Sequence, residues 1–236
     1  MWVLEGPAPS SSEDLSLLDP YEYIVEHVEA VLANRLTMFL GLDEVRQLLD
    51  DWAAASTGQS RAVADAVPDS TSLCILTRVL RSLVAEGIPV ADLETILETF
   101  GAVNPFHPDL EDIIAAVRRA LASQISRLVA GRHVVHLSSK LEQDIEGYIR
   151  EDNGKRFLAM PASWSQRLRA RLPAKCRTDP DATVLVVRSA RARPYVRRLL
   201  AEASPSVFVV AETELIPAPE GVHNIAQGVA VPAGEP

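Results

Sequence analysis

The stretch LTRVLRSLVAEGIPVADLETILETF, residues 76–100, decides the fold of this chain because it predicts two amphipathic helices separated by a break. Apolar residues recur in both halves at the three- and four-residue spacing of one helix face. Gly87 is typical of a helix end and Pro89 cannot continue a helix, so a second helix is expected to begin at residue 90 or 91. Such a corner fixes the angle between its helices, and flanking helices can pack on it. The residues expected to face the common core are Leu76, Val79, Leu80, Leu83, Val84, Ile88, Val90, Leu93, Ile96 and Leu97.

Composition favours a helix-rich core and argues against binding to nucleic acid. Hydrophobic residues make up 47% of the 236 residues and aromatic residues only 5%, so the core must consist mainly of Leu, Val, Ile and Ala. The net charge is −9, and a basic footprint for nucleic acid is therefore lacking. Residues 1–131 hold 8 Lys and Arg against 20 Asp and Glu, whereas residues 132–236 hold 15 against 12. This shift in charge predicts a domain boundary near residue 131.

The cysteines and the hydropathy pattern predict a soluble chain without a disulfide framework. Cys74 lies in an apolar run, which predicts a buried free thiol, and one further cysteine, Cys176, lies far along the sequence. The amino terminus shows no basic start followed by an apolar run, as a signal peptide would. Apolar runs stay well short of the roughly 20 residues that span a bilayer.

The pattern predicts an α+β fold, in which a helical subdomain at residues 20–130 precedes a small α/β subdomain at residues 131–236. Residues 1–19 are expected to be a linker with a short strand near Trp2. A helix is expected to begin at Pro20 with Asp19 as its cap.

Other helices are expected from Leu42 after a break at Gly41, at residues 61–67 after a loop at residues 57–61, and near Leu73 behind a cap at residues 70–72. Residues 109–128 predict one long amphipathic helix with Arg118, Arg119 and Arg127 on its polar side. Beyond residue 131 strands alternate with helices, which predicts a mainly parallel or mixed sheet. The strands are expected at residues 133–138, 156–160, 183–187, 207–210 and 228–231, and the helices at residues 140–150, 162–172 and 191–200.

Three segments follow one another at short spacing: FLGLDEVRQLLDDW at residues 39–52, VADAVP at residues 63–68 and LVAEGIPVADLETILETF at residues 83–100. This series resembles the cytoplasmic domain of the type III secretion export gate proteins, a family shared by bacterial injectisomes and flagella. VLVVRSARARPYVRRLLAEASPSVFVVAETELIP, residues 184–217, resembles the last subdomain of the same family. The resemblance covers roughly residues 20–232. Complete members carry a membrane-spanning first half, so the chain is expected to be a cytoplasmic fragment or a split gene product, with residues 1–19 as the remnant of an upstream subdomain.

The resemblance implies a homo-oligomeric ring, of nine subunits, at the cytoplasmic face of the bacterial inner membrane. It implies partners that are secretion chaperone–substrate complexes, a gatekeeper protein and the stalk of an ATPase, and a role in ordering export without catalysis. Contact with the membrane is expected only through a missing or separate N-terminal half. The candidate partner contacts are Arg193, Arg197 and Arg198, and the candidate subunit contacts are Phe39, Leu40 and Asp43.

Motifs for catalysis, for a cofactor or for a metal are absent from the sequence. His133 and His136 lie three residues apart on an expected strand, so they point to opposite faces and do not readily chelate one metal. The acidic pairs at residues 111–112 and at residues 212 and 214 are expected at the surface. Arginine-rich stretches at residues 167–177 and 188–198 are either a solvated face or a contact surface for an acidic partner or a neighbouring subunit. Nucleic acid is the third alternative, and the scarcity of interleaved aromatic residues argues against it.

The alternative function is a soluble regulatory or adaptor module, with the corner at residues 76–100 as a DNA-binding helix-turn-helix. Its second helix would turn Asp92, Glu94 and Glu98 toward the phosphates, which is electrostatically unfavourable. An enzyme, the third class, would need a pocket with convergent polar groups.

Overall fold

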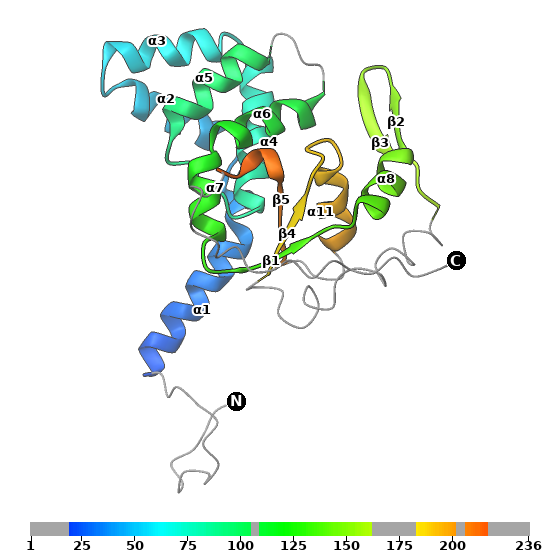
Figure 1. The fold of residues 1–236 in the computed structure, drawn as a ribbon. Coiled ribbons are helices and arrows are strands. Elements are labelled where there is room, and N and C mark those ends of the chain that lie inside the picture. Colours follow the sequence, from blue (N-terminus) through cyan, green and yellow to red (C-terminus); the bar gives the residue numbers. More distant parts are fainter. Residues whose placement is uncertain (1–18, 105–108, 162–182, 202–205, 217–236) are drawn as a thin grey trace, which may run out of the picture.

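The computed structural model describes residues 19–104, 109–161, 183–201 and 206–216 (Figure 1). It confirms the predicted α+β class. Several predictions fall on residues that are not described: the linker at residues 1–18 with its strand near Trp2, the helix at residues 162–172, the arginine-rich stretch at residues 167–177, the environment of Cys176 and the strand at residues 228–231. Within the described part of the chain, no helix has both the length and the apolarity needed to cross a membrane.

The first part of the chain is helical, and acidic or hydroxyl side chains set where most of its helices begin. Asp19 and Glu22 form a capping box at the first helix, as Asp19 and Pro20 predict. The side chains of Ser56, Asp69, Asp92 and Asp109 accept backbone hydrogen bonds in the first turns of later helices. The elements are α1 (Pro20–Arg35), the 3₁₀ helix η1 (Leu36–Phe39), α2 (Leu42–Ala53), α3 (Thr57–Ala66), α4 (Ser70–Ala85), α5 (Leu93–Val103), α6 (Leu110–Ala120) and α7 (Ala122–Val129).

The corner between α4 and α5 forms as the sequence predicts. Gly87 has a φ of 71°, and the backbone N–H of Ile88 donates to the carbonyl of Leu83 at 2.9 Å, which closes the end of α4. The second helix begins at Leu93, two or three residues later than predicted, because the Asp92 carboxylate accepts from the backbone N–H of Thr95 at 3.2 Å. Of the predicted core positions, only Val84 and Val90 are half-buried and the others are buried.

Four local predictions are wrong, and each has a physical cause. Residues 57–61 belong to α3 and not to a loop, because Ser56 accepts from the backbone N–H of Gln59 at 3.2 Å and so caps the helix. Helix α4 begins at Ser70 because Asp69, and not residues 70–72, supplies the cap. The long helix predicted at residues 109–128 is divided at Leu121, whose ψ of 16° lies outside the α-helical range. Cys74 is exposed, because it lies on the face of α4 opposite the buried stripe.

The second part is built around a three-stranded parallel sheet in the order β1–β4–β5. The central strand β4 is buried at all five positions, as a strand covered on both faces must be. The strands of the sheet are β1 (His133–His136), β4 (Thr183–Val187) and β5 (Phe208–Ala211), and the other elements are α8 (Ser139–Gly147), α11 (Arg193–Ala201) and the 3₁₀ helix η2 (Glu212–Glu214).

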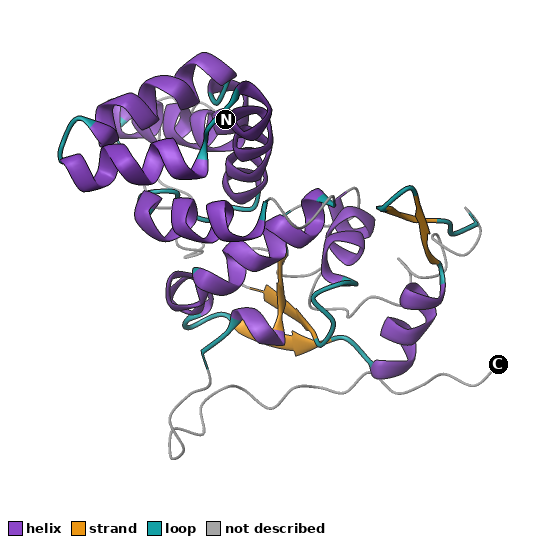
Figure 2. Cartoon of the chain, turned by 90° about the horizontal axis from the view of Figure 1, so that it is seen from above, coloured by secondary structure: helices purple, strands orange, loops and turns teal. Residues whose placement is uncertain are grey.

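An antiparallel hairpin of β2 (Ile149–Asp152) and β3 (Lys155–Leu158) stands off from the sheet (Figures 1 and 2). Asn153 and Gly154 connect the strands, with φ of 49° and 73°. Two positive values of φ are what a two-residue type I′ turn requires. The predicted helix at residues 140–150 therefore ends at Gly147, and its last residues belong to β2.

Two hydrophobic cores lie on opposite faces of the sheet. Side chains of β4 alternate between the two faces of the sheet, so that Val184 and Val186 join the core of helices α2 to α7. Leu185 and Val187 point the other way, into a second core with α8 and α11. Figure 2 shows the helices of the first part gathered over one side of the sheet. Since both cores meet at β4, the sheet is held from both faces.

Candidate functional site

An apolar surface on the first helix and its continuation is the first candidate, and we call it the apolar ridge. Helix α1 projects away from the rest of the chain in Figure 1, and those of its apolar side chains that the structure describes lie in the open. Tyr21 is 81% exposed and Met38 is 74% exposed, values unusual for side chains of this kind. The ridge comprises Tyr21, Tyr23, Ile24, Val25, Val28, Leu36, Met38, Phe39 and Leu42.

The three predicted subunit contacts lie at the end of the ridge. Phe39 is 59% exposed and Asp43 is exposed in the first turn of α2. Leu40 is half-buried against the core, and its carbonyl accepts from Nε of Arg81 at 2.5 Å. The structure thus brings these residues together on one surface, and their contact with a subunit stays a prediction.

The second candidate is a cluster of four charged side chains near the carboxyl end of β5, which we call the buried ion network. Arg118 of α6 is completely buried, and its guanidinium binds Oε2 of Glu86 at 2.8 Å and Oε2 of Glu214 at 2.6 Å. Arg193 of α11, 2% exposed, binds the same Oε2 of Glu86 at 2.7 Å. Nη2 of Arg118 also donates to the carbonyl of Val209 at 3.2 Å. These contacts tie α4, α6, α11 and the end of β5 into one unit.

The buried ion network keeps the Glu86 carboxylate ionised. Burial alone would raise the pKa of Glu86, but Arg118 and Arg193 beside it lower that pKa below its usual value. Burial would likewise lower the pKa of Arg118, but Glu86 and Glu214 raise it. Two guanidinium groups and two carboxylates leave the network without net charge, which is how buried charges are tolerated in proteins.

Two of the surface predictions for these residues are wrong. Arg118 was expected on the polar side of its helix, and Glu214 at the surface, yet both are buried. The spacing of the apolar residues could have predicted the burial of Arg118, because position 118 lies four residues after Ile114 and three before Leu121 on the same helix face. Arg119, one position further, is exposed as expected.

The three predicted partner contacts on α11 have different environments. Arg193 is buried in the ion network, with its partners inside the chain. Arg197 is half-buried, and its Nη1 is buried without a hydrogen-bond acceptor among the described residues. Arg198 is exposed, binds Glu111 and lies 5.5 Å from the centre of the Tyr195 ring. Arg197 and Arg198 are thus the ones that reach a surface.

A second ionic contact holds the hairpin to the helices. Nε of Arg156, on β3, binds Oδ2 of Asp109 at 2.8 Å, and the same guanidinium binds Asp112. Burial would raise the pKa of Asp109, but its hydrogen bonds with Arg156 and with the backbone of Glu111 lower it. The pair at residues 111–112, expected as free surface acids, is therefore engaged with Arg198 and Arg156.

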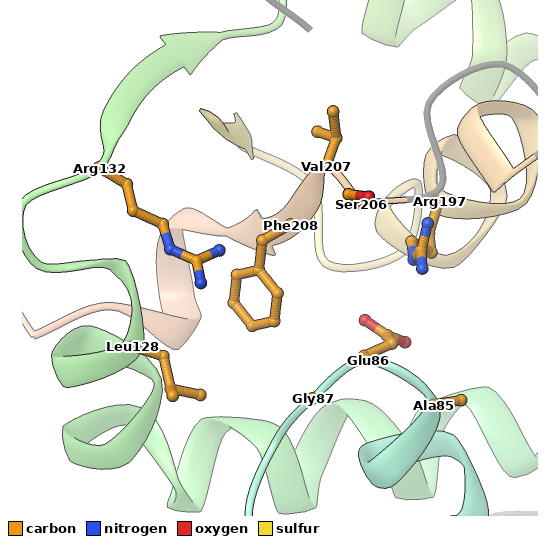
Figure 3. A pocket seen from close by; sticks show the side chains of 9 residues that line it. All are labelled: Ala85, Glu86, Gly87, Leu128, Arg132, Arg197, Ser206, Val207 and Phe208. Carbon is orange, nitrogen blue, oxygen red and sulfur yellow. The ribbon is translucent and has the colours of Figure 1, made fainter. Parts of the chain in front are cut away.

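A pocket of about 210 Å³ lies beside the ion network, between the end of α4 and the start of β5. Figure 3 shows the Arg132 guanidinium on one side of the Phe208 ring, with Arg197 and Glu86 on the other. Arg132 lies 5.8 Å from the centre of that ring. Ser206 completes the polar lining.

The described residues hold no group of three or more potential ligands that could bind a metal ion. His133 and His136 are both exposed at the ends of β1. The exposed side of α5 carries Glu94 and Glu98, so the described surface of this helix is acidic and gives no support to a DNA-binding corner.

Known structures share this fold. The CdsV protein in the Chlamydia pneumoniae CdsV–CdsO complex superposes with a TM-score of 0.73 at 25% identity, over 85% of this chain and 59% of that one. The nonameric EPEC SctV-C superposes with a TM-score of 0.70 at 20% identity, over 82% of this chain and 59% of that one. The fold is that of the cytoplasmic domain of type III secretion export gate proteins.

The sequence comparison defines the family. The chain belongs to the FHIPEP family, whose model matches residues 1–220. The flagellar biosynthesis protein FlhA of Caulobacter vibrioides is 25% identical over 209 residues, which cover 86% of this chain. Those residues cover 29% of that relative, so this chain spans less than a third of its length.

Proposed function

We propose that this chain acts as the cytoplasmic domain of an export gate and assembles into a ring of nine subunits at the inner membrane. The ring docks chaperone–substrate complexes, a gatekeeper protein and an ATPase stalk, and it orders the export of the substrate proteins without catalysing a reaction. Membership of the FHIPEP family supports the class of function, and the nonameric state of EPEC SctV-C supports the ring. The CdsV–CdsO complex supports docking of a further protein on this fold.

The apolar ridge is the observation that carries the proposal. Nine large apolar side chains lie in the open between residues 21 and 42, within the helical part that the family resemblance associates with ring contacts. Burying apolar surface contributes about 25 cal/mol per Å². A neighbouring subunit that covered the ridge would therefore stabilise the ring, and Phe39, Leu40 and Asp43 would lie at the edge of that contact.

Light scattering after size exclusion, over a range of protein concentrations, tests the proposal. We expect the mass to rise with concentration toward a discrete assembly, and Ile24→Ser on the ridge to shift that rise to higher concentration. A mass that stays at one subunit at the highest concentration would contradict ring assembly by this chain. Assembly that is unchanged in Ile24→Ser would contradict the placing of the contact on the ridge.

A further inference from the structure

We propose that the pocket beside the ion network binds an acidic polypeptide segment, through Arg132 on one side of the Phe208 ring and Arg197 on the other. The pocket is lined by the end of α4, by Arg132 before β1, by Arg197 of α11 and by residues 206–208. It lies within one chain, so the inference stands apart from ring assembly and can fail without it.

The two arginines have no acidic residue of their own among the described residues, although Arg197 is one of the cations that lower the pKa of Glu86. Neither Arg132 nor Arg197 forms an ion pair with any described residue, unlike Arg118, Arg193 and Arg198. Nη1 of Arg197 is buried and has no acceptor in the described part of the chain. Leaving a buried donor unsatisfied costs about 1–3 kcal/mol, more for a charged group. An acceptor in the pocket would remove that cost once the Arg197 side chain turned Nη1 toward it.

The charge balance of the pocket favours an anion. Glu86 is the one acidic residue in its lining, and its Oε2 already accepts from both Arg118 and Arg193. The two positive charges of Arg118 and Arg193 balance the two negative charges of Glu86 and Glu214. Arg132 and Arg197 are thus an excess of two positive charges at the pocket wall. A carboxylate accepts hydrogen bonds from guanidinium groups in the geometry that gives the strongest such bonds.

The size and the neighbours of the pocket indicate what carries the carboxylate. A volume of about 210 Å³ is smaller than the roughly 300–1,000 Å³ of pockets that hold cofactors and similar ligands. It admits the end of a side chain but not a nucleotide. The ring of Phe208 and the side chain of Leu128 give it an apolar wall, which suits the methylene groups of a glutamate. We therefore assign the occupant as an acidic side chain of a protein partner, and not as a free inorganic anion.

A labelled peptide of four glutamates, acetylated and amidated at its ends, tests the assignment by fluorescence anisotropy at low ionic strength. We expect binding to the wild-type chain, and losses of about 10- to 100-fold in affinity for Arg197→Gln and for Arg132→Gln, because each removes hydrogen bonds to a charged group. The matched control is Arg127→Gln, which removes one exposed positive charge on α7 outside the pocket. It should leave the affinity within about twofold, because a distant exposed charge is screened.

Three outcomes would overturn the proposal. The first is no binding of the glutamate peptide, or equal binding of a peptide of four glutamines. The second is an equal loss in Arg127→Gln, which would mean attraction by net charge alone. The third is binding of inorganic phosphate that Arg197→Gln abolishes while the peptide does not bind. Arg132 lies outside the buried ion network, so its variant keeps the test valid if Arg197→Gln weakens folding.

Discussion

The buried ion network and the apolar ridge reverse the usual distribution of side chains, and they do so in opposite ways. The network places four charged side chains where the helices meet the sheet, with Arg118 and Arg193 no more than 2% exposed. The ridge leaves nine large apolar side chains in the open. Charges in the interior fix one arrangement of α4, α6, α11 and β5, because any other would leave a charge unpaired. The exposed apolar side chains of the ridge do not hold elements of the chain together, and they offer a surface to a partner.

The largest effect is expected from breaking the network at Arg118. Arg118→Met leaves Glu86 and Glu214 with fewer cations in a buried site, and we expect the free energy of unfolding to fall by about 3–5 kcal/mol. Urea unfolding measures the loss. The matched control is Arg119→Met on the exposed side of the same helix, which should stay within about 0.5 kcal/mol. Equal losses in both variants would contradict a special role for the buried arginine.

Acid should weaken the network next. The folded-state pKa of Glu86 is lowered from its ordinary value of 4.5, so the stability it contributes is fully present above pH 4.5. That stability is lost as the pH falls through the lowered folded pKa, at up to about 1.4 kcal/mol per pH unit for one proton. Urea unfolding at pH values from neutral to about pH 3 checks the slope. Glu86→Gln cannot take up this proton, so its slope should be shallower by that amount, and an unchanged slope would contradict the prediction.

A substitution at Gly87 tests the turn that positions Glu86 in the buried ion network. Its φ of 71° lies in the left-handed region, so Gly87→Ala should lower the free energy of unfolding by roughly 1–2 kcal/mol although the side chain meets no neighbouring atom. Gly147, in α8, also has open space at the Cβ position but no positive φ. Gly147→Ala should therefore be neutral or stabilise by up to about 1 kcal/mol. If both substitutions had the same effect in urea unfolding, strain at Gly87 would be excluded.

Sequence reasoning succeeded where one local pattern determines the structure. The α4–α5 corner, the cap at Asp19 and the buried strand at residues 183–187 follow from helix periodicity, capping chemistry and an unbroken apolar run. The family resemblance extended this to the whole fold, because its motifs occur in order in both parts of the chain.

The ion network escaped prediction because its members lie far apart in sequence. Glu86 and Glu214 are 128 residues from each other, and no pattern of local spacing joins them. The exception is Arg118, which lies on the apolar stripe of its helix and could have been suspected of burial. The Asn153–Gly154 pair is a turn motif from which the hairpin could have been predicted. The first hairpin strand was missed because its opening residues continue the apolar spacing of helix α8. The pocket depends on the same distant contacts, so only its Arg197 was singled out from sequence.

The smallest effect on folding is expected at the ridge, where the effect on assembly should be largest. Phe39→Ser removes a ring that is 59% exposed, so the free energy of unfolding of the single chain should change by less than about 0.5 kcal/mol. If a neighbouring subunit covers that ring, each contact should lose roughly 1–2 kcal/mol, and assembly should require a higher concentration. The control is Phe157→Ser on the hairpin, a ring that is 48% exposed and far along the chain from the ridge. Light scattering should separate the two variants while urea unfolding does not. Equal masses for both would place the subunit contact elsewhere, whereas a large loss of stability in Phe39→Ser would mean that the ridge supports the fold of the single chain.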